Sequence, residues 1–547
     1  MTDERGPAAG TRRAQSVAGA ALLITAVTLA SRVVGFGRWL AQAQSLGTGG
    51  IDGPFNSANI LPNILFEVAA GGALAGAVVP LVAGPLSRAA LTTEGAAAAR
   101  ATASRSASAL LCWSFVVLVP LGALTALLAE PVAGALRLDD PVMVDAAARF
   151  LRVFAVQIPV YGLAVVLGGI LQAHKRFFWQ AFAPLVSSLV VIVVYVVFAG
   201  LADGHQGDVG ALPRAAFEWL AWGTTVGVAF LALPLLLPVH RTGLHLRPTL
   251  RFPAGEGSRA ARLAFAGIGA LVAQQLSVFV VMRTANAVGG LSVWTVYQYV
   301  QQVYLLPYAV LAFPIATSAF PHLTGHAAAG RLQEMRALVA STTRSLVLAV
   351  GAGVAALLAA APFVQLVFDV VARGRGAEGL ATGLTWMAPG MVGFALILHL
   401  SRALYAVDAG RAAVTATAAG WLVVTGAALL VPVVVSRIAG ADPSWGTVLG
   451  LLGGAGTLGM CVAGPGCWSR CVAGSVRRRW WGCRGRWASS RSAPRSAPSS
   501  AGSSPCRAPS AGRRPSPRAS GSGQRPARRR RSSCCSSRSP TRACGGG

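Results

Sequence analysis

The amino-acid sequence predicts an all-α integral membrane protein: about 12 transmembrane helices in two six-helix lobes around a central cavity, followed by a disordered Arg/Ser/Pro-rich C-terminal tail. Two observations lead to this prediction. Of 547 residues, 54% are hydrophobic and 12% charged, with a mean hydropathy of +0.58. Apolar runs of about 18 residues or more recur along the chain, and each can cross the bilayer as a helix that satisfies its own backbone groups.

The apolar runs place twelve spans. We expect no cleavable signal peptide before them, because the first run is longer than a signal's hydrophobic region and does not lead to a small-residue cleavage site. The predicted spans cover about 16–40, 56–84, 107–128, 146–171, 178–201, 218–238, 261–283, 294–319, 342–368, 382–406, 412–436 and 445–464.

Charged residues in the loops predict the orientation. Basic residues precede the first span and follow the second, fourth, sixth and eighth, as with Arg12, Lys175 and Arg176. The intervening loops are acidic and hold Asp52, Glu130, Asp139, Asp140, Asp145, Asp203 and Asp208. Under the positive-inside rule, both termini are cytoplasmic. We therefore expect a multi-pass protein of the cytoplasmic (inner) membrane.

The basic loop after the sixth span divides the predicted spans into two halves. The strings Gly168–Arg176 and Ser401–Arg411 end equivalent spans of the two halves, and duplicated bundles are common in transporters, although any helix end offers similar residues. The predicted organisation is a cytoplasmic N-terminus (1–15), an N-terminal lobe (16–238), a basic cytoplasmic loop (239–260), a C-terminal lobe (261–464) and a basic tail (465–547).

The tail differs from the rest of the chain. From Cys461 onward there are 19 arginines, no lysine and no acidic residue, and eight of the nine cysteines lie there. Such a segment cannot bury a core. Binding to anionic lipid and binding to nucleic acid are two interpretations. We favour a third, a shifted reading frame, because the composition changes abruptly. We therefore expect no specific nucleic-acid partner and no zinc site.

The first span contains Arg32 and Arg38. An arginine near the bilayer centre costs roughly 2.5–3.5 kcal/mol and persists where it faces a wet cavity or an anion. The two residues are about 9 Å apart along an ideal helix and about 120° apart around it. A bend at Gly35 or Gly37 would direct both into one cavity, where their guanidinium groups match phosphate oxygens. The alternative for Arg38 is snorkelling to the head groups.

Other spans contain further polar candidates. Glu67 in the second span either pairs with Arg32 or Arg38, or serves as a proton or cation site, or only locks two helices. Gln298 and Gln302 share one face of the eighth span, either as cavity hydrogen-bonding groups or as contacts between helices. Arg283, at the end of the seventh span, is expected at the interface. Arg402 in the tenth span is a cavity candidate with Asp408 as its partner.

These residues resemble the MurJ (MviN) lipid II flippase family, within the multidrug and lipid-linked oligosaccharide exporter superfamily. The resemblance rests on Ser31–Arg38, Asp52, Leu61-Pro62-Asn63, Ala181–Pro184 and Arg402–Ala406, and covers about residues 15–460. It implies two six-helix lobes around a cationic cavity. The residues that we predict to contact the substrate are Ser31, Arg32, Arg38, Gln302 and Arg402, and those that we predict to have secondary or charge-balancing roles are Asp52, Glu67, Arg283 and Asp408.

The sequence also departs from the family pattern. Many members have paired arginines where this chain has Phe66 and Glu67, and many have an arginine where Gln302 stands. An acidic residue associated with cation binding in some members is replaced near Val281. The last two of the family's fourteen spans are absent, and the Arg-rich segment takes their place.

The preferred functional hypothesis is a flippase that carries the undecaprenyl-pyrophosphate-linked peptidoglycan precursor, lipid II, by alternating access. Membrane lipids and the cell-wall synthesis machinery are its expected partners. The alternatives are a cation-coupled exporter of drugs or another lipid-linked glycan, and an inactive scaffold paralogue. An enzyme is disfavoured, because no metal-spaced or nucleophile–base grouping occurs. We expect no cofactor, and the driving force, a coupling cation or the membrane potential, is unassigned.

The orientation can be tested by labelling. We expect single cysteines introduced in the loops near Asp52, Asp139 and Asp203 to react with an impermeant thiol reagent in intact cells, because these loops are predicted to lie outside. A cysteine in the 240–260 loop is the control and should react only after permeabilisation. Labelling of the 240–260 loop alone in intact cells would invert the orientation.

Overall fold

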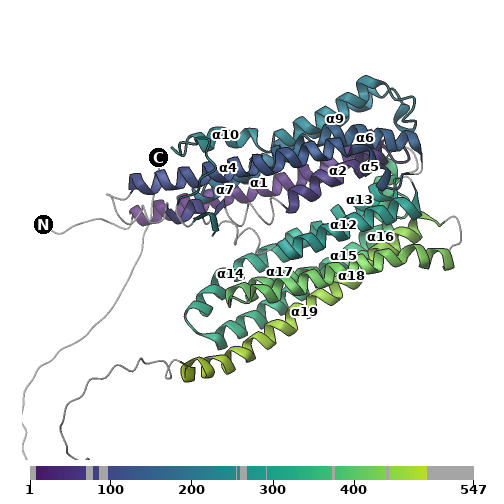
Figure 1. Cartoon of the computed structure of the whole chain (residues 1–547). Coiled ribbons are helices and arrows are strands. Elements are labelled where there is room, and N and C mark those ends of the chain that lie inside the picture. Colours follow the sequence, from purple (N-terminus) through teal and green to yellow (C-terminus); the bar gives the residue numbers. More distant parts are fainter. Residues whose placement is uncertain are drawn as a thin grey trace, which may run out of the picture. The chain divides into compact units, whose positions relative to one another are not determined.

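The computed structural model describes residues 8–68, 78–79, 81–85, 96–138, 140–253, 256–258, 268–290, 292–372, 376–438 and 443–488. The chain divides into two compact units, Met1–Cys483 and Arg484–Gly547. Helices account for nearly all the regular structure of the first unit, as Figure 1 shows. The second unit is described only over its first five residues, which end the last helix.

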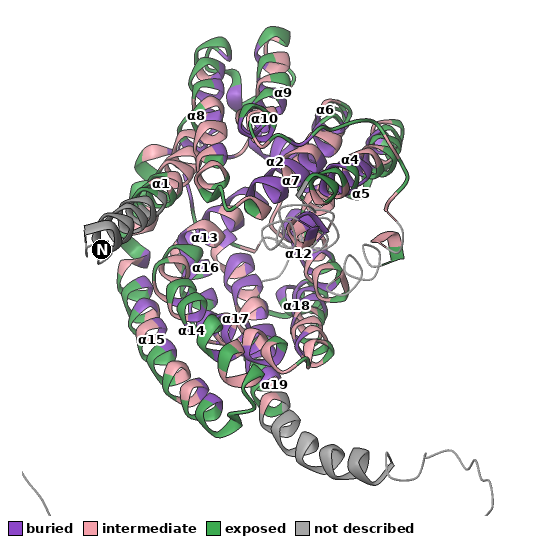
Figure 2. Cartoon of the chain, turned by 90° about the vertical axis from the view of Figure 1, so that its left-hand side faces the viewer, coloured by how far each residue is buried: buried purple, intermediate pink, exposed green. Residues whose placement is uncertain are grey.

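Two groups of helices make up the first unit (Figures 1 and 2). The N-terminal group contains α1 (Ala8–Leu46), α2 (Asp52–Phe66), α4 (Ala96–Leu127), α5 (Ala129–Ala135), α6 (Pro141–Phe154), α7 (Gln157–Ala173), α8 (Phe177–Leu201), the 3-10 turn η2 (His205–Gly207), α9 (Arg214–Ala229) and α10 (Leu233–His240). The C-terminal group contains α12 (Ile268–Gly289), α13 (Val293–Pro307), the π-helical η3 (Tyr308–Ala312), α14 (Phe313–Ala328), α15 (Leu332–Val371), α16 (Leu380–Met387), α17 (Gly390–Ala406), α18 (Gly410–Ile438) and α19 (Trp445–Ala488).

The helices confirm the predicted all-α membrane class. Within the described residues, nine helices are long and apolar enough to span a membrane, and the bent pair α16–α17 makes a tenth. These ten coincide with the third to twelfth predicted spans. The first predicted span lies within α1, and the second covers α2 and continues into residues 69–77, outside the described ranges.

Equivalent helices pack together in the two groups. The most extensive packing in the N-terminal group joins α1 to α8, and in the C-terminal group α12 to α18. These pairs correspond to the first and fifth spans of one predicted half and the first and fifth of the other. The same pairing twice in one chain supports an internal duplication, which the similarity of the two helix-end strings left open.

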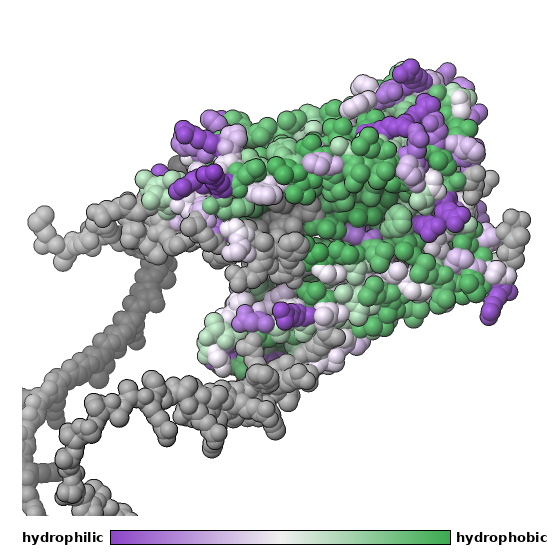
Figure 3. Space-filling view, in the orientation of Figure 1, coloured by the Kyte–Doolittle hydropathy of each residue, from purple (hydrophilic) through white to green (hydrophobic). Residues whose placement is uncertain are grey.

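Large apolar side chains fill the space inside and between the groups. Phe55 packs edge-on against Phe150 and Phe154, with ring centroids 5.5 and 5.7 Å apart. Trp39 of α1 contacts Tyr299 of α13 across the two groups at 6.2 Å. The outer faces remain apolar, as on α15, where Val370 is 78% exposed. Figure 3 shows this apolar surface between ends at which hydrophilic residues gather, as expected for helices surrounded by lipid.

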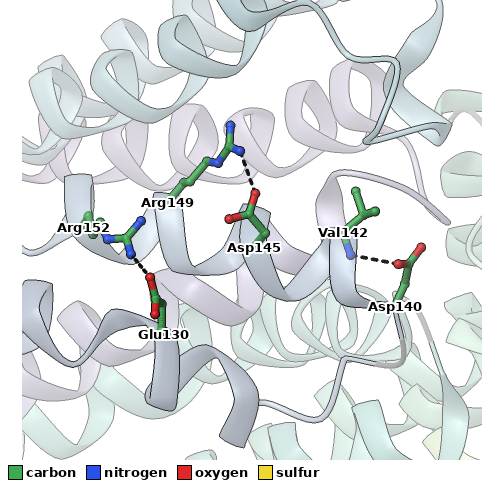
Figure 4. A network of polar contacts seen from close by, with 6 residues as sticks. All are labelled: Glu130, Asp140, Val142, Asp145, Arg149 and Arg152. Atoms are coloured by element: carbon green, nitrogen blue, oxygen red, sulfur yellow. Dashed lines mark hydrogen bonds and ion pairs between the residues drawn. The ribbon is translucent and has the colours of Figure 1, made fainter.

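Polar contacts hold the acidic end of α5 and α6 (Figure 4). Asp140 caps α6 by accepting a hydrogen bond from the Val142 N–H at 2.8 Å. Arg149 pairs with Asp145 at 2.8 Å, and Arg152 reaches back to Glu130 on α5. Each pair is largely exposed and adds little stability. The loop predicted to be acidic is therefore partly neutralised by arginines about two and three turns into α6.

The predicted basic loop is an extended strap along α4. The N–H groups of His245, Arg247 and Thr249 donate to Ser104 Oγ, Ser108 Oγ and Cys112 Sγ at 3.2, 3.0 and 3.3 Å. Acceptors four residues apart are about 6 Å apart along a helix, and donors two residues apart are about 6.6 Å apart along an extended chain. The two spacings match, so every second N–H of the strap meets an acceptor on α4. Pro248, which has no N–H, falls between two donors.

The last helix extends beyond its predicted end. The sequence places the tail from 465, whereas α19 continues through Pro465 to Ala488. Proline is tolerated in membrane helices because neighbouring groups satisfy the freed carbonyl. Residues 489–547, which hold the rest of the predicted tail including Arg528–Arg531, lie outside the described residues.

The strap makes a prediction for hydrogen exchange. Replacing Ser104 and Ser108 together by alanine removes two acceptors, each worth about 1 kcal/mol. We expect amide exchange across residues 243–250 to accelerate about fivefold, measured by mass spectrometry on the purified protein. Peptides from α9 serve as the internal control. Unchanged exchange in the strap would mean that these two hydrogen bonds do not hold it.

Candidate functional site

Buried hydrogen bonds join the two helix groups at one end, which we call the closed end. Thr295 of α13 is their centre: its Oγ1 accepts from Asn56 Nδ2 at 3.0 Å and donates to the Asp52 carbonyl at 3.4 Å. Ser292 Oγ accepts from the Gly49 N–H at 2.8 Å. Thr48 Oγ1 donates to the Gly376 carbonyl at 2.7 Å. The turn between α1 and α2 is thus bonded to the C-terminal group.

Two further contacts extend this network. Asn286 of α12 donates to Ser57 Oγ at 3.1 Å and to the Leu136 carbonyl at 2.9 Å. Within the N-terminal group, Gln42 donates to Asn56 Oδ1 at 2.9 Å and accepts from the Tyr195 hydroxyl at 3.3 Å. Buried polar networks of this kind specify one arrangement of the helices, because an unpaired partner would cost free energy.

Asp52 is fully buried at the closed end. It is the first residue of α2, ahead of the second predicted span, and its Oδ1 accepts from the Gly50 N–H at 3.0 Å. Burial raises the pKa of Asp52 to about 6, although Ser292, Gly50 and Thr295 oppose this by favouring the ionised form. The carboxylate therefore lies within the closed end, and no described ion pair includes it. Its charge-balancing role stays a prediction.

Arg38 faces polar groups of the N-terminal group. Its Cζ lies 4.9 Å from the Trp39 ring centroid, and its charge acts on the buried hydroxyls of Tyr161 and Tyr195. Tyr161 in turn donates to Asn63 Oδ1 at 3.3 Å. Arg38 is half-buried. The arrangement leaves a cation beside several hydroxyl and amide groups, a combination suited to binding an anion.

Arg32 and Ser31 lie one to two turns nearer the start of α1. Arg32 is exposed and Ser31 half-buried. The helix continues through Gly35 and Gly37 without interruption, and a Cβ at either glycine would contact nothing within 4 Å. The two arginines therefore have different surroundings, and open space lies beside the helix between them. Their common role in substrate binding stays a prediction.

Arg402 lies in an aromatic region of the C-terminal group. It donates to Thr317 Oγ1 at 2.8 Å and lies over the Phe313 ring at 5.5 Å from its centroid. Tyr308 stands in the adjacent π-helical turn, which packs on Phe394 with ring centroids 4.6 Å apart. A π-helical turn in a membrane helix often accompanies a functional site. Gln302, on α13 just before this turn, is half-buried.

Three other predicted site residues, all charged, have no described ion pair. Asp408 is exposed in the turn after α17 with a positive φ of 55°, and among the described ion pairs none joins it to Arg402, which binds Thr317 instead. Arg283 is exposed on α12, which continues to Gly289, and its interfacial position stays a prediction. Glu67 forms no described ion pair with Arg32 or Arg38.

A pocket of about 320 Å³ contains Glu67. It lies among the end of α2, α7, α8 and α10, and its lining includes Phe66, Gln172, Gln180, Gly168 and Leu235. The Gln180 amide donates to Gln172 Oε1 at 3.4 Å. Within the described ranges, no His, Cys, Asp or Glu group is arranged to hold a metal ion.

Sequence reasoning missed the residues that close the structure. Asn56, Thr295 and Asn286 appear in the sequence as isolated polar residues in apolar helices. Such residues usually have a buried partner, so the signal was present. Their partners are 150 to 239 positions away in sequence, and only the folded chain identifies them.

Comparisons with known proteins show which family this chain resembles. A family model described as lipid II flippase MurJ matches residues 42–446. A probable lipid II flippase MurJ from Rhizobium meliloti (strain 1021) is 28% identical over 356 residues, which cover 62% of this chain and 61% of that protein. The lipid II flippase MurJ of Burkholderia cenocepacia is 28% identical over 406 residues, covering 71% and 73%. The match thus spans less than two thirds of the Rhizobium protein.

Solved structures share the fold. Lipid II flippase MurJ in an inward closed conformation overlaps with a TM-score of 0.60 at 16% identity, covering 81% of this chain and 86% of that one. An inward-facing multidrug resistance transporter of the MATE family gives 0.62 at 14% identity, covering 83% and 98%. An outward-facing MATE transporter gives 0.51 at 15% identity, covering 82% and 96%. At these identities the likeness is one of fold.

We expect the closed end to be sensitive to pH, because burial raises the pKa of Asp52. Its pKa is about 6 when buried and about 3.8 when hydrated, so the closed state holds more protons between these values. It therefore gains stability as the pH falls through 6 and loses it as the pH rises. Lowering the pH from about 7 to about 5 should raise the closed-to-open ratio about tenfold, and Asp52→Asn should remove the effect.

The ratio can be measured from electron–electron distances between spin labels at Asp203 and Glu378, two exposed residues near the closed end, in a background without native cysteines. The wild-type background is compared with Asp52→Asn at each pH. An unchanged pH response in the Asn variant would assign the effect to another group and contradict the role of Asp52.

Proposed function

Because this chain belongs to the lipid II flippase MurJ family, whose model matches residues 42–446, we propose that it carries lipid II from the inner to the outer leaflet of the cytoplasmic membrane by alternating access. The family consists of transporters, so the chain is a transporter and not an enzyme. The observation that carries the proposal is the closed end, which joins two helix groups through a polar network at one end only of the described structure.

The orientation of the closed end defines the proposed conformation. If the N-terminus is cytoplasmic, the turn between α1 and α2 faces outward. The strap along α4, with its arginines, then faces the cytoplasm. The described hydrogen bonds between the groups lie at the outward end, so the proposed state is inward-facing. Breaking them would open the outer side, as alternating access requires.

The arginines supply the proposed contact with the pyrophosphate. Arg38 lies beside Tyr161 and Tyr195, and Arg32 is exposed nearer the start of α1. A guanidinium group remains charged in a cavity and can bind phosphate oxygens through two parallel hydrogen bonds. In the C-terminal group, Arg402 and half-buried Gln302 are proposed to contact the head group.

A cation-coupled exporter is the second candidate. The observation that favours it is Glu67, a carboxylate in a pocket of the N-terminal group without a described ion pair. Sodium or proton dependence of transport would distinguish this function from a flippase driven by the membrane potential alone. Membrane lipids and the cell-wall synthesis machinery remain proposed partners.

We expect Arg32→Ala and Arg38→Ala each to lower lipid II flipping about tenfold or more, because each removes a charge-assisted contact with the pyrophosphate. Arg32→Lys should recover part of the activity, since it keeps the charge without the planar fork. Flipping is measured by the accessibility of lipid II at the outer surface of cells that depend on this protein.

Arg214→Ala is the matched control, because Arg214 is exposed at the start of α9, away from α1. Protein amounts in the membrane are compared for every variant. Full activity of both alanine variants would contradict the proposed phosphate contact, and loss of protein from the membrane would instead indicate a structural role.

A further inference from the structure

The Glu67 pocket combines one carboxylate, two amides and apolar walls. Its volume is about 320 Å³, larger than a bare cation needs. Its polar members, Glu67, Gln172 and Gln180, come from three different elements. The remaining walls are apolar and are formed by Val79, Ala164, Val165, Ala183, Pro184, Leu231 and Leu235, together with Phe66 and two glycines.

Gly168 leaves space beside the polar residues of the pocket. A Cβ at Gly168 would lie 3.6 Å from Gln180 Nε2 and 4.0 Å from Leu235 Cδ1. Any longer side chain at this position would therefore point toward the polar residues and occupy their space. Gly169 is closer still to its neighbour, because a Cβ there would lie 2.5 Å from Val78 Cγ1.

The polar atoms of the pocket are suited to an ammonium group. Glu67 has two acceptor oxygens and no described ion pair, and Gln180 uses its Nε2 to donate to Gln172. The Gln180 carbonyl oxygen is then an additional acceptor. A primary ammonium has three N–H donors and needs three acceptors, while the methylene groups that carry it would contact the apolar walls.

The pocket also lies close to the proposed phosphate contact. Tyr161 stacks on Phe66 with ring centroids 4.4 Å apart, and both Glu67 and Arg38 act electrostatically on its hydroxyl. A carboxylate and a guanidinium group therefore flank one tyrosine within a single helix group. Such a pair is complementary to a molecule that carries an anionic and a cationic group together.

We propose that the pocket formed by Glu67, Gln172 and Gln180 binds a primary ammonium group on an alkyl arm of the transported head group. This inference rests on the proposed function and adds a contact for the peptide part of the substrate. Glu67 forms the ion pair with the ammonium group, the two glutamines orient it, and Arg38 holds the phosphate on the other side of Tyr161.

The test uses lipid II whose peptide carries a lysine side-chain amine, either free or acetylated. Binding to the purified full-length protein is measured by native mass spectrometry. Acetylation removes the charge and one or more hydrogen bonds to Glu67, so we expect the wild-type protein to bind the free amine about tenfold more tightly. Glu67→Gln keeps the shape but not the charge, and should bind the two forms equally.

Two further variants test whether binding depends on the space of the pocket and on this particular carboxylate. Gly168→Leu fills the pocket and should also abolish the preference for the free amine. Glu218→Gln is the matched control, because Glu218 is a carboxylate in a separate apolar groove between α8 and α9, with Trp219 and Trp222. This variant should retain the wild-type preference.

The outcomes distinguish the inference from the proposed function. Equal binding of both forms by the wild-type protein, or a preference retained by Glu67→Gln, overturns the ammonium site and leaves the flippase proposal intact. Failure of both forms to bind overturns the flippase proposal and the inference with it. Replacing sodium by choline, a cation without N–H donors, at constant ionic strength should not change the preference. A change would assign Glu67 to a free cation and overturn the inference.

Discussion

Hydrogen bonds buried where the turn between α1 and α2 meets the start of α13 hold the two helix groups together. Thr295 contacts both Asn56 and Asp52, and Ser292 contacts Gly49. Water is excluded there, so each bond that breaks leaves a polar group to be hydrated or paired again. In the proposed alternating access, these bonds would be made in the closed state and hydrated in the open one, which gives two distinct arrangements of the helix groups.

The charged groups inside the helix groups have a different role. Arg38 and Arg402 are each surrounded by aromatic rings and hydroxyl or amide groups rather than by carboxylates. An arginine paired with a carboxylate would be neutralised, whereas one beside tyrosine and threonine keeps its charge available. In the proposed function, these surroundings would leave each guanidinium group available to the anionic substrate.

The strap along α4 is attached to the N-terminal group. It carries the chain from the N-terminal group toward the C-terminal group, and its alternate N–H groups are bonded to one face of α4. The arginines of the strap are among the basic residues from which a cytoplasmic position of this loop is predicted.

Composition and hydropathy were sufficient to predict the helical membrane class, and ten of the twelve predicted spans coincide with membrane-length helices of the described chain. Local apolar length determines a membrane helix, because its backbone bonds are internal. The site was only partly predictable. Arg38, Glu67 and Arg402 stood out as charges in apolar runs, but the pairing of Asn56 with Thr295 and the pocket around Glu67 join residues more than 100 positions apart. Only tertiary packing decides which polar groups meet, because many alternative partners satisfy the same local sequence.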